Sequence, residues 1–146
     1  MPRWLQAPDD YHSLMGSLTV IDAVRAALAD HPSLKLVMLF GSVAQGTERP
    51  DSDVDIAVQA AQPLTATQKM ALVGDLAQAT GRAVDLVDLH AVGEPLLGQI
   101  LAHGKRLQGS DEAYAALLSR HLLDAADFLP YAQRIVDERR RAWIGR

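Results

Sequence analysis

Residues 34–58 decide the fold, and they read LKLVMLF GSVAQGTERPDS DVDIAV. The apolar run over residues 34–40 ends at Gly41, and its length and boundary favour a buried strand over a helix. Residues 41–52 are rich in Gly, Ser and Pro, which predicts a turn or loop. A second strand is expected over residues 53–59. The direct step between these strands favours antiparallel or mixed pairing, because parallel strands need a longer crossover.

The flanking segments predict helices packed on a small sheet. Apolar residues three and four positions apart predict a helix over residues 18–30, preceded by a loose lead-in that contains Trp4. The other expected elements are a helix over 65–80, a strand over 82–89, a helix over 95–103, an edge strand over 105–107 and a helix from Ser110. Pro130 is expected to kink or break this last helix before a basic helical segment. The fold class is therefore α/β (α+β), with a small mixed β-sheet and helices packed on it.

Composition narrows the class of protein. The 146 residues suit one domain, and 49% hydrophobic with 22% charged residues is typical of a globular protein. The absence of cysteine excludes disulfides, thiol catalysis and cysteine-ligated zinc. No apolar run is long enough to span a membrane and no signal peptide is evident, so we expect a soluble, cytoplasmic protein. A net charge of −4 argues against direct nucleic-acid binding through phosphates.

Three aspartates are the strongest candidates for chemistry. Asp53 and Asp55 are two positions apart on an expected strand, so their side chains share a face with Cα atoms about 7 Å apart. Their mutual repulsion would be relieved by a divalent metal, and Mg²⁺ prefers one or two carboxylates plus substrate phosphates. Two solvated aspartates are the simpler alternative, but the apolar residues that follow indicate burial. Asp85, inside an aliphatic strand, is expected to lie deeper than Asp88 and to supply a third carboxylate, whereas Asp88 is expected at the strand end.

A Gly-Ser pair follows the first expected strand. Gly41 permits a tight turn and a close approach of the backbone to a ligand. The hydroxyl and amide of Ser42 are groups that hold phosphate. The pair alone is a weak signal, because Gly-Ser after a strand commonly only turns the chain.

Taken together, Gly41-Ser42, the Asp53-Val54-Asp55 stretch and Asp85 resemble the motif of the DNA polymerase β-type nucleotidyltransferase superfamily over roughly residues 18–109. The short length, with VDLVDL and a later Gly-Lys-Arg-Leu, resembles the minimal nucleotidyltransferases. Many of these are antitoxins of a HEPN-domain RNase toxin. The resemblance thus implies a polymerase β-like nucleotidyltransferase fold.

The resemblance also implies roles for individual residues. Asp53, Asp55 and Asp85 would be the catalytic, metal-binding carboxylates, holding two Mg²⁺ ions with ATP as substrate. Gly41 and Ser42 would hold the triphosphate. Many relatives carry Arg where this chain has Gln45, and Arg49 in the same loop is expected to substitute for it as a nucleotide-binding residue.

The expected function is transfer of AMP from ATP to a hydroxyl, namely a tyrosine of a HEPN toxin, which would neutralise the toxin. The chain would form a hetero-oligomer with that toxin. One alternative is a nucleotidyltransferase for a small hydroxylated molecule such as an aminoglycoside. Another is a non-catalytic antitoxin that masks the toxin by binding. The small size favours an acceptor that brings its own surface, because little chain remains to enclose a free substrate.

The C-terminal part is expected to bind the partner. Residues 1–109 would form the nucleotidyltransferase domain and residues 110–146 a helical extension, within one compact unit. The extension ends in a basic segment that also carries apolar residues, which favours a protein partner over a merely solvated helix end. Two readings stay open for its earlier side chains, a partner surface or packing on the sheet, and these are Tyr114, Leu118, His121, Leu122, Phe128 and Leu129.

Overall fold

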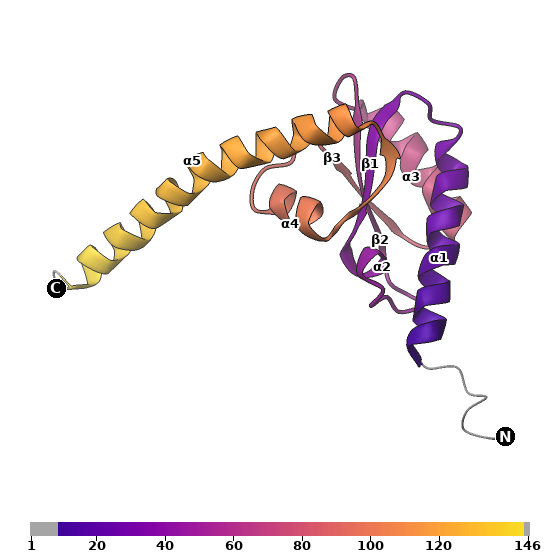
Figure 1. Cartoon of the computed structure of the whole chain (residues 1–146), viewed down its shortest axis with the longest axis horizontal. Helices are drawn as coiled ribbons and strands as arrows, with labels where there is room; N and C mark the ends of the chain where they lie inside the picture. The colour runs from indigo at the N-terminus through magenta and orange to yellow at the C-terminus, as the bar shows by residue number, and fades with distance from the viewer. Residues whose placement is uncertain (1–8, 145–146) are drawn as a thin grey trace.

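The computed structural model describes residues 9–144, which form a four-stranded sheet with helices on both faces (Figure 1). The elements in chain order are α1 (Asp9–Leu28), β1 (Leu34–Phe40), α2 (Gly41–Gln45), β2 (Val54–Ala60), α3 (Ala66–Thr80), β3 (Val84–Asp88), α4 (Leu96–His103), β4 (Lys105–Gly109) and α5 (Asp111–Ile144). Among these residues, no helix is both long and apolar enough to cross a lipid bilayer.

The sheet is mixed, as the sequence predicts. Its strand order is β3-β2-β1-β4. β1 pairs antiparallel with both β2 and β4, whereas β2 and β3 are parallel. Helix α3 provides the long crossover that the parallel pair requires. The antiparallel pairing of the first two strands and the edge position of β4 are therefore confirmed.

The core has two layers, one on each face of the sheet. Val37 and Leu39 of β1 belong to the layer beneath α1 and α3, and Leu36 and Met38 belong to the layer beneath α4 and the start of α5. Successive side chains of a strand point to opposite faces, so a strand covered on both sides must be apolar throughout. This explains why β1 is apolar from Leu36 to Phe40.

Several element boundaries differ from the expectations. Helix α1 begins at Asp9, so residues 9–15 of the expected lead-in are helical, while Trp4 and the Leu18 side chain lie outside what the structure describes. Residues 41–45 form the short helix α2 instead of a loop. The expected caps are present, since Thr65 forms a capping box with Gln68 and the Ser110 hydroxyl accepts a hydrogen bond from the amide of Ala113.

Helix α5 runs through Pro130 without a break. A proline removes one backbone hydrogen bond from the helix, and the good helix formers on both sides allow the helix to continue past it. Only the start of α5 packs on the sheet, and the remainder projects away from it (Figure 1). Exposed large apolar side chains follow along this projecting part, at Leu122, Leu123, Tyr131, Val136, Trp143 and Ile144.

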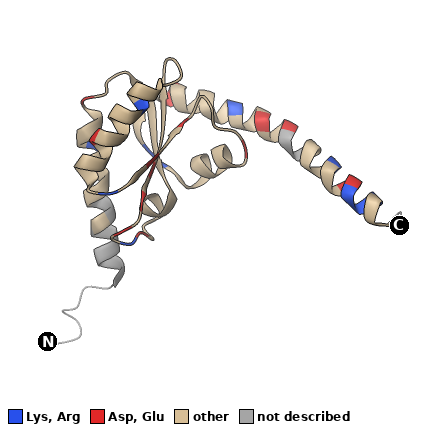
Figure 2. Cartoon of the chain, turned by 180° about the vertical axis from the view of Figure 1, so that it is seen from behind, with Lys and Arg blue, Asp and Glu red and all other residues tan. Residues whose placement is uncertain are grey.

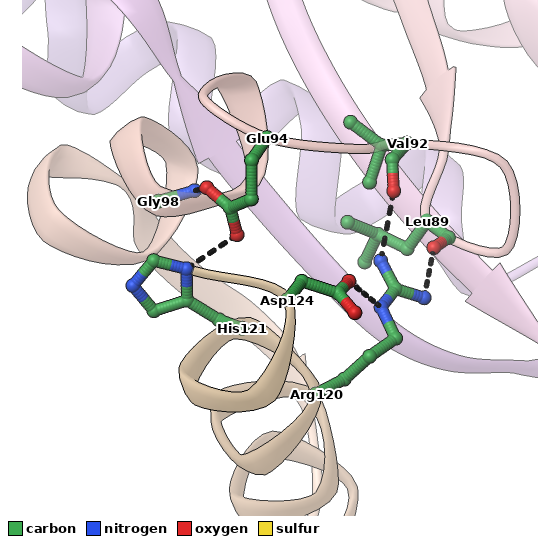
Figure 3. Close-up of polar contacts among 7 residues, drawn as sticks. All are labelled: Leu89, Val92, Glu94, Gly98, Arg120, His121 and Asp124. Atoms are coloured by element: carbon green, nitrogen blue, oxygen red, sulfur yellow. Dashed lines mark hydrogen bonds and ion pairs between the residues drawn. The ribbon is translucent and has the colours of Figure 1, made fainter. Parts of the chain in front are cut away.

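The start of α5 is fastened to the loop between β3 and α4 (Figure 3). The Arg120 guanidinium donates to the carbonyl oxygens of Leu89 at 2.6 Å and Val92 at 3.2 Å. His121 Nδ1 lies 2.5 Å from Glu94 Oε1, and the other oxygen of Glu94 accepts a bond from the amide of Gly98. His121 and the half-buried Tyr114 thus pack within this chain, whereas the side chains of Phe128 and Leu129 lie outside the description.

Candidate active site

The pairing of β2 with β3 brings two of the predicted carboxylates together. Asp53 lies immediately before β2, and Asp55 is its second residue. Asp55 is in register with Asp85 on the parallel strand β3, so their Cα atoms are about 4.8 Å apart and their side chains share a face. The sequence motif on one strand and the separate aspartate on another therefore meet at one end of the sheet.

Electrostatics links all three carboxylates. Asp55 is half-buried, and its pKa is raised above the ordinary value of 3.8, first by burial and then by the negative charges of Asp85 and Asp53. The negative charges of Asp85 and Asp53 thus each disfavour the ionised form of Asp55. A cation placed among them would reverse that penalty.

The expected depth of Asp85 is wrong. Asp85 is exposed, and it lies on β3, an edge strand of the sheet. Asp88 is the more buried of the two. Its carboxylate accepts hydrogen bonds from the backbone amides of Leu64 at 2.8 Å and His90 at 2.9 Å. Asp88 thus caps the end of β3, as predicted, and the exposed Asp85 is open to a substrate.

Gly41 lies directly against Asp55. Phe40 at the end of β1 is in register with Asp55, and Gly41 follows with a φ of +73°. A Cβ atom built on Gly41 would overlap Oδ2 of Asp55 and lie 2.9 Å from its Cγ. Both the backbone angle and the close approach therefore require glycine here. Ser42 is the next residue and is half-buried in α2.

A largely buried arginine, Arg82, organises the loop before Asp53. Arg82 Nη1 lies 2.9 Å from Glu48 Oε2 and donates to the carbonyl oxygens of Arg49 at 3.0 Å and Ser52 at 3.4 Å. The side chains of Arg82 and Glu48 are 15% and 3% exposed, so this is a buried ion pair. Arg49 is exposed and enters this network through its backbone, and its amide also donates to the Ser52 hydroxyl at 2.7 Å.

Sequence reasoning missed Arg82 and Glu48. The available signal was that Arg82 directly follows Gly81, where a helix ends, and precedes an aliphatic strand. An ordinary exposed arginine has the same local sequence pattern. Nothing in the local pattern shows that Glu48, some thirty residues earlier, folds over it. The pair links the loop that precedes Asp53 to the strand that carries Asp85.

The donor set suits a hard divalent cation. Asp53, Asp55 and Asp85 offer only carboxylate oxygens, which are the ligands that Mg²⁺ prefers. Within residues 9–144, no three His, Asp or Glu side chains already converge as a complete metal cage. Mg²⁺ commonly takes one or two carboxylates and completes its shell with water and substrate phosphates. The raised pKa of Asp55 is the observation that fits a cation at this point.

Comparison with known proteins gives consistent matches. Residues 22–113 match the family described as polymerase beta, nucleotidyltransferase. Protein adenylyltransferase MntA of Shewanella oneidensis is 44% identical over 87 residues, which are 58% of this chain and 63% of MntA. The alignment therefore spans less than two thirds of the length of that curated relative.

Solved structures resemble nearly the whole of the fold. A chain in the crystal structure of a toxin–antitoxin with AMP-PNP is 34% identical, with a TM-score of 0.72, over 81% of this chain and 96% of that chain. A chain in the structure of tri-AMPylated Shewanella oneidensis HEPN toxin in complex with MNT antitoxin is 28% identical, with a TM-score of 0.64, over 86% and 97%. With the family match covering more than half of its residues, this chain belongs to the polymerase beta nucleotidyltransferase family.

Proposed function

We propose that this chain is an antitoxin that transfers AMP from ATP to a hydroxyl, namely a tyrosine, of a cognate HEPN-domain RNase toxin in the cytoplasm. The observation that carries the proposal is the group of Asp53, Asp55 and Asp85 beside Gly41, with the raised pKa of Asp55. The similarity to protein adenylyltransferase MntA and to chains of toxin–antitoxin structures supports the choice of acceptor.

The chain's own residues divide the work of the transfer. Asp53, Asp55 and Asp85 would hold two Mg²⁺ ions, which when bound neutralise phosphate charge. Gly41 and Ser42 lie where the chain leaves β1 next to Asp55, and they would hold the triphosphate. Arg49, in the loop fixed by Arg82, is exposed and would supply the positive charge that Gln45 lacks.

The acceptor oxygen attacks the α-phosphorus of ATP in line. The bond from the α-phosphorus to the bridging oxygen breaks, and pyrophosphate leaves with that electron pair. The proton of the acceptor hydroxyl passes to Asp85, whose exposure leaves it open to an incoming side chain. The product is a phosphodiester of AMP with the acceptor. Positioning and charge stabilisation carry the rate, as in other phosphoryl transfers.

The same proposal assigns residues 110–146 to partner binding. The projecting part of α5 exposes Trp143 at 80%, Ile144 at 70% and Leu123 at 70%, which is more apolar surface than a solvated helix needs. Arginines and acidic residues lie among these apolar side chains (Figure 2). Such a mixed surface with aromatic and arginine side chains is typical of a protein interface.

The test is transfer of radiolabel from α-labelled ATP, with Mg²⁺, to a purified HEPN-domain toxin. We expect a labelled toxin, and loss of label with Asp53→Asn and Asp55→Asn while both variants remain folded. Label on an aminoglycoside instead would make the acceptor a small molecule. Tight binding of the toxin with no label from the wild-type chain would make the chain a masking antitoxin.

A further inference from the structure

One edge of the sheet is open beside the candidate active site. β3 is the outermost strand. On its inner side it is hydrogen-bonded to β2: the Val54 amide donates to the Ala83 oxygen at 2.9 Å, and the Leu89 amide donates to the Val58 oxygen at 2.8 Å. Successive residues of a strand direct their backbone groups to opposite sides. The backbone groups of Val84 and Leu86 therefore face outward, and no strand pairs with them among the described residues.

A groove runs along this open edge. It has a volume of about 490 Å³ and is lined by residues 86–88 of β3, residues 91–94 of the following loop, Lys69 of α3 and Leu96 of α4. The groove thus lies over the edge between the helices that cover the two faces of the sheet. Its lining is apolar apart from Lys69 of α3, Asp88 of β3 and Glu94 of the loop.

The loop wall of the groove is held in place. Glu94 forms its polar rim, and His121 and the amide of Gly98 bind the two oxygens of Glu94 (Figure 3). Arg120 binds the carbonyl of Val92 in the same loop. Contacts from α5 therefore fix the loop, which favours a preformed groove over one that assembles around its ligand.

The groove ends next to Asp85, because Leu86, the first residue of β3 that lines it, directly follows Asp85. Val87 lines it and lies two residues after Asp85, so both side chains are on the same face of β3. From Asp88 to Asp85 the distance along the strand is about 10 Å, or three residues of extended chain. The inner side of β3 is already paired with β2. An added strand can therefore pair with β3 beside Asp85 only at the open edge.

We infer that the acceptor segment of the toxin binds in this groove as an extended strand added to β3, which places its hydroxyl side chain beside Asp85. The inference rests on the proposed function and specifies how the macromolecular substrate is held. Main-chain hydrogen bonds to Val84 and Leu86 supply affinity, as in other cases of strand addition. Alternation along the strand then places an apolar side chain two residues from the acceptor residue, against Val87.

The chain provides a matched pair of variants. A Cβ at Gly93 meets no atom within 4 Å, and Gly93 lines the groove, so Gly93→Trp fills the groove without a clash at its own Cβ. Gly74 on α3 is equally unobstructed but lies outside the groove, so Gly74→Trp is the control. Urea unfolding of both variants checks that each is folded.

The first measurement is steady-state AMP transfer to the toxin. For Gly93→Trp we expect kcat/KM for the toxin to fall at least tenfold while KM for ATP stays unchanged, and for Gly74→Trp we expect neither to change. A wild-type chain that labels no toxin would contradict the proposed function itself. If the toxin is labelled and kcat/KM is equal for Gly93→Trp and wild type, only the inference that the acceptor segment binds in the groove is overturned.

The second measurement is amide hydrogen exchange in the complex of full-length chain and toxin. Strand addition predicts slower exchange at the outward amides of Val84 and Leu86 when the toxin is present. A toxin whose acceptor tyrosine is retained but whose flanking apolar residue is replaced by aspartate should give less protection. Unchanged exchange at both amides would overturn strand addition whatever the result with Gly93→Trp.

Discussion

Replacement of Gly41 by alanine is expected to disable transfer by displacing Asp55. The φ of +73° costs an L-residue about 1–2 kcal/mol. The new Cβ would lie 2.9 Å from Asp55 Cγ, where carbon atoms prefer about 3.5 Å or more, so the carboxylate must shift by roughly 0.6 Å at least. Since a misplacement of about 1 Å costs on the order of 10²-fold in rate, we expect kcat to fall by about that factor.

Gly46→Ala is the matched control. Gly46 has a φ of +72°, and a Cβ there meets no atom within 4 Å, so this variant carries the same backbone strain without the collision. Urea unfolding should show a loss of about 1–2 kcal/mol in both variants. Transfer of labelled AMP at saturating ATP should fall strongly only in Gly41→Ala. An equal loss of transfer in both would refute the role assigned to the contact with Asp55.

Four further outcomes are expected. Burial, Asp85 and Asp53 raise the pKa of Asp55, so the folded chain binds that proton more tightly than the unfolded chain and the charged form destabilises the fold. Asp55→Asn should therefore unfold at higher urea than wild type at pH 7, with the gap closing as the pH falls through the raised pKa towards the ordinary value of 3.8. Because a cation among the three carboxylates would reverse that penalty, added Mg²⁺ should narrow this gap at pH 7. Arg82→Ala should cost about 3 kcal/mol of unfolding free energy by removing the guanidinium from a buried carboxylate, and Arg82→Lys should recover part of it. Arg120→Ala should cost about 2 kcal/mol in the same assay through its two carbonyl contacts, whereas Arg139→Ala on exposed α5 should change little.

The sequence predicted the sheet and the identity of its clustered aspartates because both depend on local pattern. The apolar run of β1 and the alternation after Asp53 identify strands by their spacing, and the short step between them favours antiparallel pairing. The strand over 84–88 follows from the same reasoning, and a helical crossover makes it parallel to β2. In the structure, the register of these two strands places Asp85 opposite Asp55.

What could not be predicted depends on contacts between distant residues. The depth of Asp85 was judged from its aliphatic neighbours, but exposure is set by its position on an edge strand, which the sequence does not state. The pairing of Arg82 with Glu48 joins segments more than thirty residues apart. The course of α5 through Pro130 depends on the helix formers around it outweighing one lost hydrogen bond, a balance that a local rule about proline does not capture.

The length of α5 gives the proposed reaction a tether. Its 34 residues extend about 51 Å at 1.5 Å per residue, so a toxin docked on its outer part stays within a fixed radius of the carboxylates. Attachment at a second point makes the encounter intramolecular, which raises the effective concentration of the acceptor where the geometry lets both sites engage. The acceptor then returns to the carboxylates repeatedly during one residence of the toxin. The yield per encounter would be governed by how long the helix retains its partner.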